Sequence, residues 1–182
     1  MYNNVNNVNN VNICFPRDTP VVTDQGEIMI QNINKTNTLN GKKVVAITES
    51  VPLDETIVVI EKDALFKNMP SQKTKISLNH RLLFKGEMVK ASELVDKVEG
   101  AYLEKYNKEI LYNVLLNTHE KMIVNNLICE TLDPYNMVAL LYKNRSKMSN
   151  KKYNRLVGEI NKTVKDRDII NFTKIGKRLL LI

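Results

Sequence analysis

The chain has very few of the side chains that perform nucleophilic or acid and base chemistry near neutral pH. Its 182 residues include two cysteines, two histidines and no tryptophan. Two cysteines are too few for a disulfide scaffold, and the absence of CxxC and HExxH patterns argues against a zinc site. We therefore expect no metal and no cofactor. The candidates for chemistry are Cys14, His80, His119 and Cys129.

Long apolar runs and export signals are also missing. Residues 1–12 are Asn and Val repeats without a basic leader, and no run approaches the length of a membrane span. We expect a monomer in a reducing, cytoplasmic compartment, with no membrane partner. The abundance of Asn and Lys is typical of AT-rich genomes, which suggests a microbe or a large DNA virus acting in its host cell.

Positive charge is concentrated towards the C-terminus. Residues 131–182 hold twelve Lys and Arg against four Asp and Glu, while the whole chain has a net charge of +7. Clustered cations raise affinity for phosphate, but this segment has no glycine-rich aromatic platform, zinc finger or clear helix-turn-helix pattern. We interpret the charge as a solvated helix face and do not expect a nucleic-acid partner.

The residue pattern divides the chain into three regions. Residues 1–13 form an Asn-rich leader with too little apolar surface to offset ordering, and we expect it to be flexible. Residues 14–131 contain short β runs separated by turn signals such as Asn40-Gly41, which predicts an all-β domain. Residues 132–182 change to helical spacing and predict a small basic α-helical appendage.

Two helices are expected in this appendage. A short one runs from Asn136 to Tyr142, and a longer one is capped by Ser149. The apolar residues of the longer helix recur at spacings of three and four, which places them on one face. They are Tyr153, Leu156, Val157, Ile160 and Val164.

Cys14 stands where the leader meets the first β run, within reach of the carbonyl of Ile13. Attack through a five-membered ring would convert the Ile13–Cys14 amide into a thioester. The departing nitrogen is a poor leaving group, so it needs a proton donor, and His80 and His119 are the candidates. The plainer alternative is that Cys14 is a buried apolar residue and that the histidines are ordinary surface or hydrogen-bonded side chains.

Three ordered blocks resemble those of the Hint (hedgehog/intein) domains. The first is Cys14-Phe15-Pro16 followed by Asp18-Thr19-Pro20-Val21 and Gly26. The second is Ser77-Leu78-Asn79-His80-Arg81-Leu82-Leu83-Phe84, which is similar to the Thr-x-x-His block of the family. The third comprises Leu111-Tyr112-Asn113-Val114-Leu115-Leu116 with His119, and Ile123 to Ile128, with Asn125-Asn126 where the family usually has Asn-Gly.

The resemblance implies a horseshoe-shaped, mostly antiparallel β fold whose first and last strands run side by side. It implies that Cys14 is the nucleophile, that His80 strains or protonates the scissile amide, and that Ser77 replaces the Thr of the family. His119 would assist later proton transfers and should lie near Cys14 and His80. Cys129 remains open, either as a buried apolar residue or as a second thiol that accepts the acyl group or forms a disulfide with Cys14.

The resemblance also limits the reaction. The His-Asn pair that ends a splicing intein is absent after Asn126, so we expect cleavage of the Ile13–Cys14 bond without splicing. The substrate would be the chain's own N-terminal flank, and water or a small thiol would accept the acyl group. Two alternatives stay open: an inactive Hint-like module that binds nucleic acid or a partner through its basic tail, and a cysteine hydrolase acting in trans. A hydrolase nucleophile commonly lies at a helix N-terminus.

Overall fold

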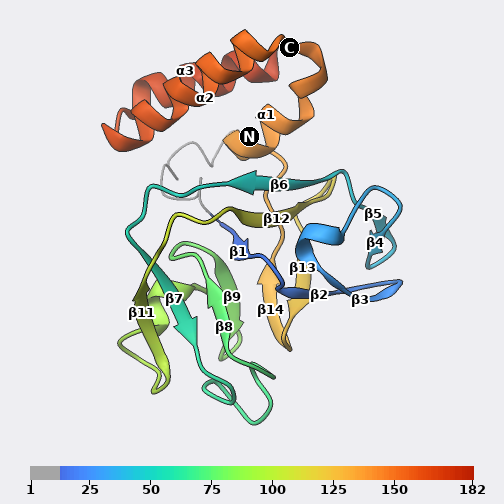
Figure 1. Ribbon diagram of the computed structural model, residues 1–182, viewed down its shortest axis with the longest axis vertical. Coiled ribbons are helices and arrows are strands. Elements are labelled where there is room, and N and C mark those ends of the chain that lie inside the picture. Colours follow the sequence, from blue (N-terminus) through green and yellow to red (C-terminus); the bar gives the residue numbers. More distant parts are fainter. Residues whose placement is uncertain (1–12) are drawn as a thin grey trace. The chain divides into compact units, whose positions relative to one another are not determined.

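The computed structural model describes residues 13–182, so the leader expected at 1–13 lies outside the described residues except for its last member. The chain divides into two compact units, one ending at Pro134 and the other beginning at Tyr135. Figure 1 shows strands in the first, which we call the β unit, and only helices in the second, the helical unit. Among the described residues, no helix is both long and apolar enough to cross a bilayer.

The β unit is built from short strands. They are β1 (Phe15–Pro16), β2 (Pro20–Thr23), β3 (Gly26–Met29), β4 (Thr38–Leu39), β5 (Lys42–Lys43), β6 (Ala46–Ser50), β7 (Thr56–Ile60), β8 (Thr74–Ile76), β9 (Arg81–Phe84), β10 (Glu87–Lys90), β11 (Ala101–Lys105), β12 (Leu111–Leu115), β13 (Lys121–Val124) and β14 (Leu127–Glu130). Short 3-10 helices occur at Ile30–Asn32 and Ala91–Leu94.

These strands form antiparallel sheets. Some strands pair with the next strand along the chain, and others pair with strands that are far away in the sequence. The largest sheet has the order β10-β9-β14-β13-β2-β3, and two smaller ones have the orders β1-β12-β6 and β11-β7-β8. The expectation that the first and last strands pair is wrong, because β1 pairs with β12 while β14 lies between β9 and β13. Pro16 has no backbone N–H to extend a ladder, and the chain continues into β2, which pairs with β13 instead.

Turn chemistry sets the register of the hairpins. Asn40 and Gly41 both have positive φ, 50° and 75°, and they join β4 to β5 as the sequence predicted. Lys85 and Gly86, at 49° and 87°, join β9 to β10 in the same way.

The helical unit has an apolar core of its own. Its elements are α1 (Met137–Lys143), a 3-10 helix at Arg145–Lys147, α2 (Asn150–Lys165) and α3 (Ile169–Leu180). The predicted cap at Ser149 is confirmed, since its side chain accepts from the N–H of Lys152. The short helix expected from Asn136 begins one residue later, and the side chain of Asn136 caps it by accepting from the N–H of Val138. The predicted face of α2 is confirmed too, with Leu156 and Ile160 buried in the core of the unit.

Candidate active site

The Ile13–Cys14 peptide bond is buried inside the β unit. Ile13 is 2% exposed and Cys14 is 4% exposed, so the expectation of a flexible chain up to Cys14 is wrong at Ile13. Cys14 packs in a small apolar cluster with Ile57, Tyr106 and Leu111, which come from β7, the segment after β11, and β12. This buried chain segment precedes a β strand and not a helix, which does not fit the arrangement expected of a hydrolase nucleophile.

Burial keeps the Cys14 thiol protonated. Desolvation raises its pKa to about 12, although the hydroxyl of Ser50, 3.0 Å from Sγ, favours the thiolate and opposes the shift. Ser50 lies at the end of β6, where it is paired with Leu111. The sequence analysis missed this residue, and nothing in its local pattern distinguishes it from other serines. A proton acceptor is therefore required when the thiol attacks a carbonyl.

Ser77 holds the backbone of Cys14 from both sides. Its hydroxyl accepts a hydrogen bond from the Cys14 N–H at 2.8 Å, and its own N–H donates to the Cys14 carbonyl at 3.1 Å. Ser77 is itself buried. The structure therefore brings together these two predicted site residues, which are separated by 63 positions in the sequence, and fixes the plane of the Ile13–Cys14 amide.

His80 is fully buried and lies in the turn between β8 and β9. Its ring lies 4.5 Å from that of Phe15, and its Nε2 is 2.8 Å from the carbonyl oxygen of Glu130. A carbonyl only accepts, so Nε2 carries the proton of the neutral ring and Nδ1 keeps the lone pair. Nδ1 is buried and makes no hydrogen bond with any described residue.

The environment of His80 favours this neutral form. Burial lowers the pKa of the ring, and the carbonyl of Glu130 and the backbone of Cys14 only partly oppose that effect. The sequence interpretation made His80 a proton donor. With its lone pair on Nδ1, the ring must first accept a proton before it can give one to the departing nitrogen.

Asn113 holds the carbonyl of the same peptide bond, and the sequence analysis missed it. Its Nδ2 donates to the Ile13 carbonyl oxygen at 2.5 Å, while its Oδ1 accepts from the Val114 N–H at 2.7 Å. Asn113 is fully buried in the middle of β12, whose five residues are all buried. A single amide in an otherwise apolar strand is the signal that could have identified it, because buried polar groups need a partner.

His119 lies at the edge of the site and is 44% exposed at its side chain. Its Nε2 is 3.2 Å from a carboxylate oxygen of Glu130, which raises the pKa of the ring chiefly through that hydrogen bond. The structure thus connects both histidines to one residue, His80 through the carbonyl of Glu130 and His119 through its carboxylate.

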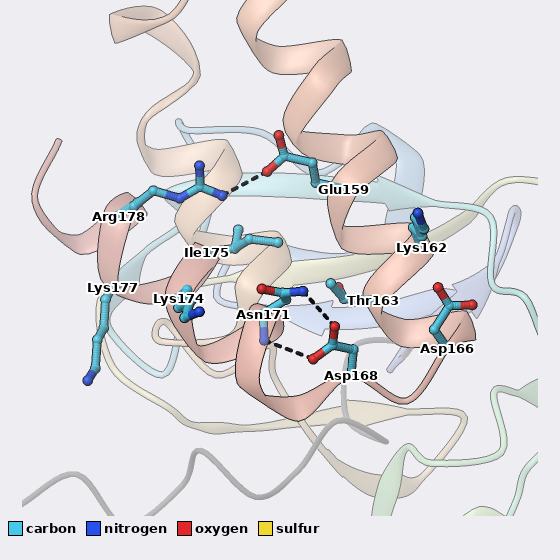
Figure 2. A pocket seen from close by; sticks show the side chains of 10 residues that line it. All are labelled: Glu159, Lys162, Thr163, Asp166, Asp168, Asn171, Lys174, Ile175, Lys177 and Arg178. Carbon is cyan, nitrogen blue, oxygen red and sulfur yellow. Dashed lines mark hydrogen bonds and ion pairs between the residues drawn. The ribbon is translucent and has the colours of Figure 1, made fainter.

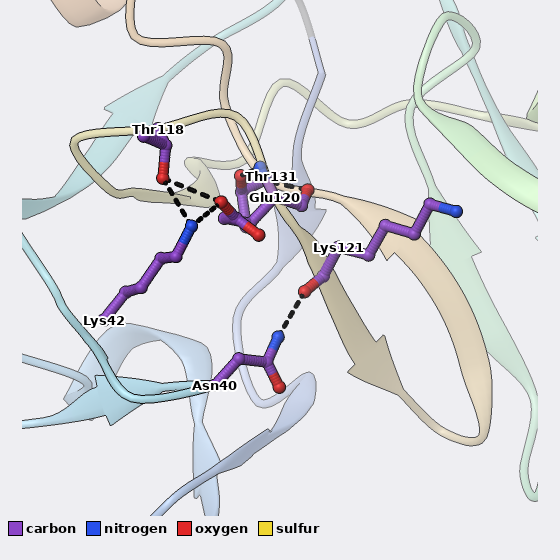
Figure 3. A network of polar contacts seen from close by, with 6 residues as sticks. All are labelled: Asn40, Lys42, Thr118, Glu120, Lys121 and Thr131. Carbon is purple, nitrogen blue, oxygen red and sulfur yellow. Dashed lines mark hydrogen bonds and ion pairs between the residues drawn. The ribbon is translucent and has the colours of Figure 1, made fainter.

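The turn that carries His119 is fastened on both sides (Figure 3). Lys42 donates to Thr118 at 3.0 Å and also bonds the carboxylate of Glu120. Thr131 accepts from the Glu120 N–H at 2.9 Å and donates back to the Glu120 carbonyl at 3.2 Å. These bonds link residues 118–120 to the β4–β5 hairpin and to the residue that follows β14. Because both chain neighbours of His119 are held, the backbone that carries its imidazole has little freedom to move.

Cys129 has the surroundings of a buried apolar residue. It is 0% exposed, lies in β14 opposite Leu82 and Met122, and belongs to the main core, whereas Cys14 belongs to the smaller cluster. Burial raises the pKa of its thiol strongly. Both cysteines are free thiols, and the described hydrogen bonds and cluster contacts of Cys14 do not include Cys129.

The helical unit contains a groove between α2 and α3, about 830 Å³ in volume (Figure 2). Arg178 bonds Glu159 at 2.7 Å across it, and Asp168 caps α3 by accepting from the Asn171 N–H. Cations and carboxylates are nearly balanced along its walls, so the groove itself has no strong attraction for a polyanion. Its charged lining residues are Lys162, Lys174, Lys177, Arg178, Glu159, Asp166 and Asp168.

Comparison with known families matches residues 13–136, about two thirds of the chain, to the model of the Hint domain. The chain belongs to the Hint family. This confirms the family resemblance inferred from the sequence blocks, and with it a Hint fold bearing a short helical C-terminal unit. No curated protein sequence matches the chain.

Two solved structures are similar to this chain, and the first of them supports the fold. An intein-like domain from Clostridium thermocellum is 16% identical, with a TM-score of 0.51 over 66% of this chain and 98% of its own. A DnaB intein from Synechocystis is 11% identical, with a TM-score of 0.44 over 66% of this chain and 99% of its own. At these identities the likeness concerns the Hint fold alone.

Proposed function

We propose that this Hint domain cleaves its own Ile13–Cys14 peptide bond through a thioester, without splicing. The observation that carries the proposal is that the carbonyl oxygen and the N–H of this buried bond are each hydrogen-bonded to a buried side chain. Asn113 donates to its carbonyl oxygen, Ser77 accepts its N–H, and the thiol belongs to Cys14 itself. Membership of the Hint family supports an autoprocessing role in general.

In the proposed first step Cys14 Sγ attacks the carbonyl carbon of Ile13. The negative charge that develops on the carbonyl oxygen is stabilised by the Asn113 amide, which already points at it. The C–N bond then breaks, and the acyl group is transferred from nitrogen to sulfur. His80 Nδ1 takes the thiol proton and returns it to the nitrogen of Cys14, so that the protons balance.

In the second step water or a small thiol attacks the thioester and releases the N-terminal flank. The lack of a His-Asn pair after Asn126 supports cleavage as the end point, since the segment continues as Leu127 to Thr131. The products are a chain that begins at Cys14 with a free amine and a free thiol, and the peptide of residues 1–13, which ends in a carboxylate where water attacks and in a thioester of the added thiol where a thiol attacks.

The test is intact-mass measurement of freshly purified protein during incubation with dithiothreitol. We expect the peptide of residues 1–13 to be released as one piece, because thiolates attack thioesters readily. The matched control is Cys14→Ala, which should remain intact under the same conditions. An unchanged mass in protein shown to be folded would count against the proposal, and so would cleavage of Cys14→Ala at the same bond.

A further inference from the structure

Glu130 is the residue that both histidines contact. It ends β14, is 6% exposed, and has its polar atoms directed to two separate segments, the consecutive residues His80 and Arg81 and the loop residue His119. Its carbonyl accepts from His80 Nε2 at 2.8 Å, one carboxylate oxygen accepts from the Arg81 N–H at 3.1 Å, and the other lies 3.2 Å from His119 Nε2. A buried carboxylate is costly unless it is paired, so these contacts fix its position.

We propose that Glu130 is a positioning residue that ties the two histidines of the site together, through its carbonyl to His80 and its carboxylate to His119. This inference rests on the proposed function, because it assigns Glu130 a part in the same cleavage. Glu130 does not touch the scissile bond in the structure, and it acts only through the two imidazoles.

The two attachments have opposite effects on the two rings. At His80 the carbonyl fixes the tautomer, while burial lowers the pKa, so the ring is a neutral base. At His119 the carboxylate raises the pKa, so the ring remains protonated to higher pH. Two titratable groups whose surroundings push their pKa values apart are a recurrent way to obtain a base and an acid in one site.

Other groups near His119 act on its ring less strongly than the carboxylate of Glu130 does. Asp133 raises the pKa of the ring through space and the backbone of Thr131 adds a hydrogen bond, both less than Glu130 does. Glu120 is the next residue in the chain, but its carboxylate bonds Lys42 and Thr118. His80 and His119 oppose each other's positive charge weakly.

The sign of the pH effect follows from these contacts. Because the pKa of His119 is raised, the ring keeps its proton, and with it the ion pair to the Glu130 carboxylate, to higher pH than a free imidazole, and the pair is lost as pH rises through that pKa. Replacing Glu130 with glutamine keeps the backbone carbonyl that His80 contacts and nearly the same side-chain volume, but it removes the charge that faces His119. The tautomer of His80 should persist, while His119 should lose its proton at a lower pH.

The first measurement is an NMR titration of the two histidine rings in the Cys14→Ala background, which cannot cleave by the proposed route. Glu130→Gln should lower the pKa of His119. The matched control Glu120→Gln removes the same charge from the adjacent residue, which interacts with His119 only through space, and should lower that pKa less than Glu130→Gln does. An unchanged pKa of His119 in Glu130→Gln would overturn the proposal, as would an equal fall in the control.

The second measurement is the ratio of the cleavage rate of Glu130→Gln to that of the unaltered chain, followed over pH at fixed dithiothreitol. The ionisation of the added thiol cancels in this ratio. Between the two measured pKa values of His119 the ratio should fall roughly threefold to tenfold, less than a fully buried hydrogen bond to a charged group would give, because the His119 side chain is 44% exposed. Below both values and above both, it should return towards one.

The two measurements separate the possible failures. A purely structural role for Glu130 would give a reduced ratio that does not vary with pH, which would overturn the proposal. If the unaltered chain does not cleave at all, the proposed function is overturned together with the coupling to cleavage. The titration would then still show, on its own, whether Glu130 holds His119.

Discussion

The β unit and the helical unit treat polar side chains in opposite ways. In the β unit Ser77, His80, Asn113 and Glu130 are all buried, and each is hydrogen-bonded to the backbone near the Ile13–Cys14 bond or to another member of the set. In the helical unit the buried core is almost entirely apolar, and its charges lie outside. The arrangement of the helical unit is what stability alone requires.

This contrast indicates that the β unit, and not the helical unit, carries the proposed reaction. Burying an imidazole, an amide and a carboxylate costs free energy that an apolar core would not. The amide of Asn113 contacts the Ile13–Cys14 bond directly, while the imidazole of His80 and the carboxylate of Glu130 belong to the hydrogen-bonded set beside it, an arrangement that stability does not require. The following predictions test this difference, beginning with the change expected to have the largest effect on cleavage.

His80→Ala should slow the acyl shift by roughly 100-fold to 10,000-fold, the range of general acid and base catalysis. Ser77→Ala should slow it by only roughly fivefold, because a neutral hydrogen bond contributes about 1 kcal/mol. Both rates are measured as appearance of the peptide of residues 1–13 by mass spectrometry. Equal rates in His80→Ala and the unaltered chain would remove His80 from the reaction.

A folding defect must be separated from this effect, since His80 is fully buried. His80→Gln retains a side-chain N–H that can donate to the Glu130 carbonyl and leaves a smaller cavity, but it has no titrating base. It should keep the native circular dichroism spectrum and still cleave as slowly as His80→Ala. Near-normal cleavage by His80→Gln would show that the ring acts only by filling space.

Asn113→Leu should slow cleavage by roughly 100-fold, somewhat less than the loss of His80. Leucine has nearly the same volume but cannot donate to the Ile13 carbonyl, and removal of one oxyanion donor costs about 2.7–4 kcal/mol in other acyl transfers. The rate is measured as above, with the melting temperature as the control for folding. If Asn113→Leu cleaves at the normal rate, the hydrogen bond to Ile13 is structural and the proposed stabilisation of the oxyanion is wrong.

The sequence predicted most of the fold because the signals for its elements are local. Apolar periodicity and the cap at Ser149 were sufficient for α2, and the short helix expected from Asn136 corresponds to α1. The helix α3 was missed because β-branched residues and Gly176 weaken its helical signal.

Within the candidate site, the sequence pointed to residues whose types are rare in this chain and to one residue of the family blocks. Cys14 and the two histidines stand out in a chain with so few of each, and the family blocks added Ser77. Asn113, Ser50 and Glu130 belong to common residue types, and their importance comes from contacts across 100, 36 and 50 positions of sequence. Such contacts depend on strand pairing, which the sequence pattern did not specify correctly for β1.

The smallest effect on cleavage is expected from the helical unit. Leu156 is 4% exposed in its core, so Leu156→Ala should destabilise that unit by about 2–5 kcal/mol, the usual cost of removing a buried leucine side chain. Because the groups proposed to act in cleavage all belong to the β unit, the cleavage rate should stay within about twofold of normal. Chemical denaturation followed by circular dichroism measures the loss of stability, and mass spectrometry measures the cleavage rate.

The matched control is Lys151→Ala on the exposed side of α2, which should change stability by no more than about 0.5 kcal/mol. If Leu156→Ala slows cleavage as strongly as Asn113→Leu, then the two units depend on each other, and the division of function from stability drawn above does not hold.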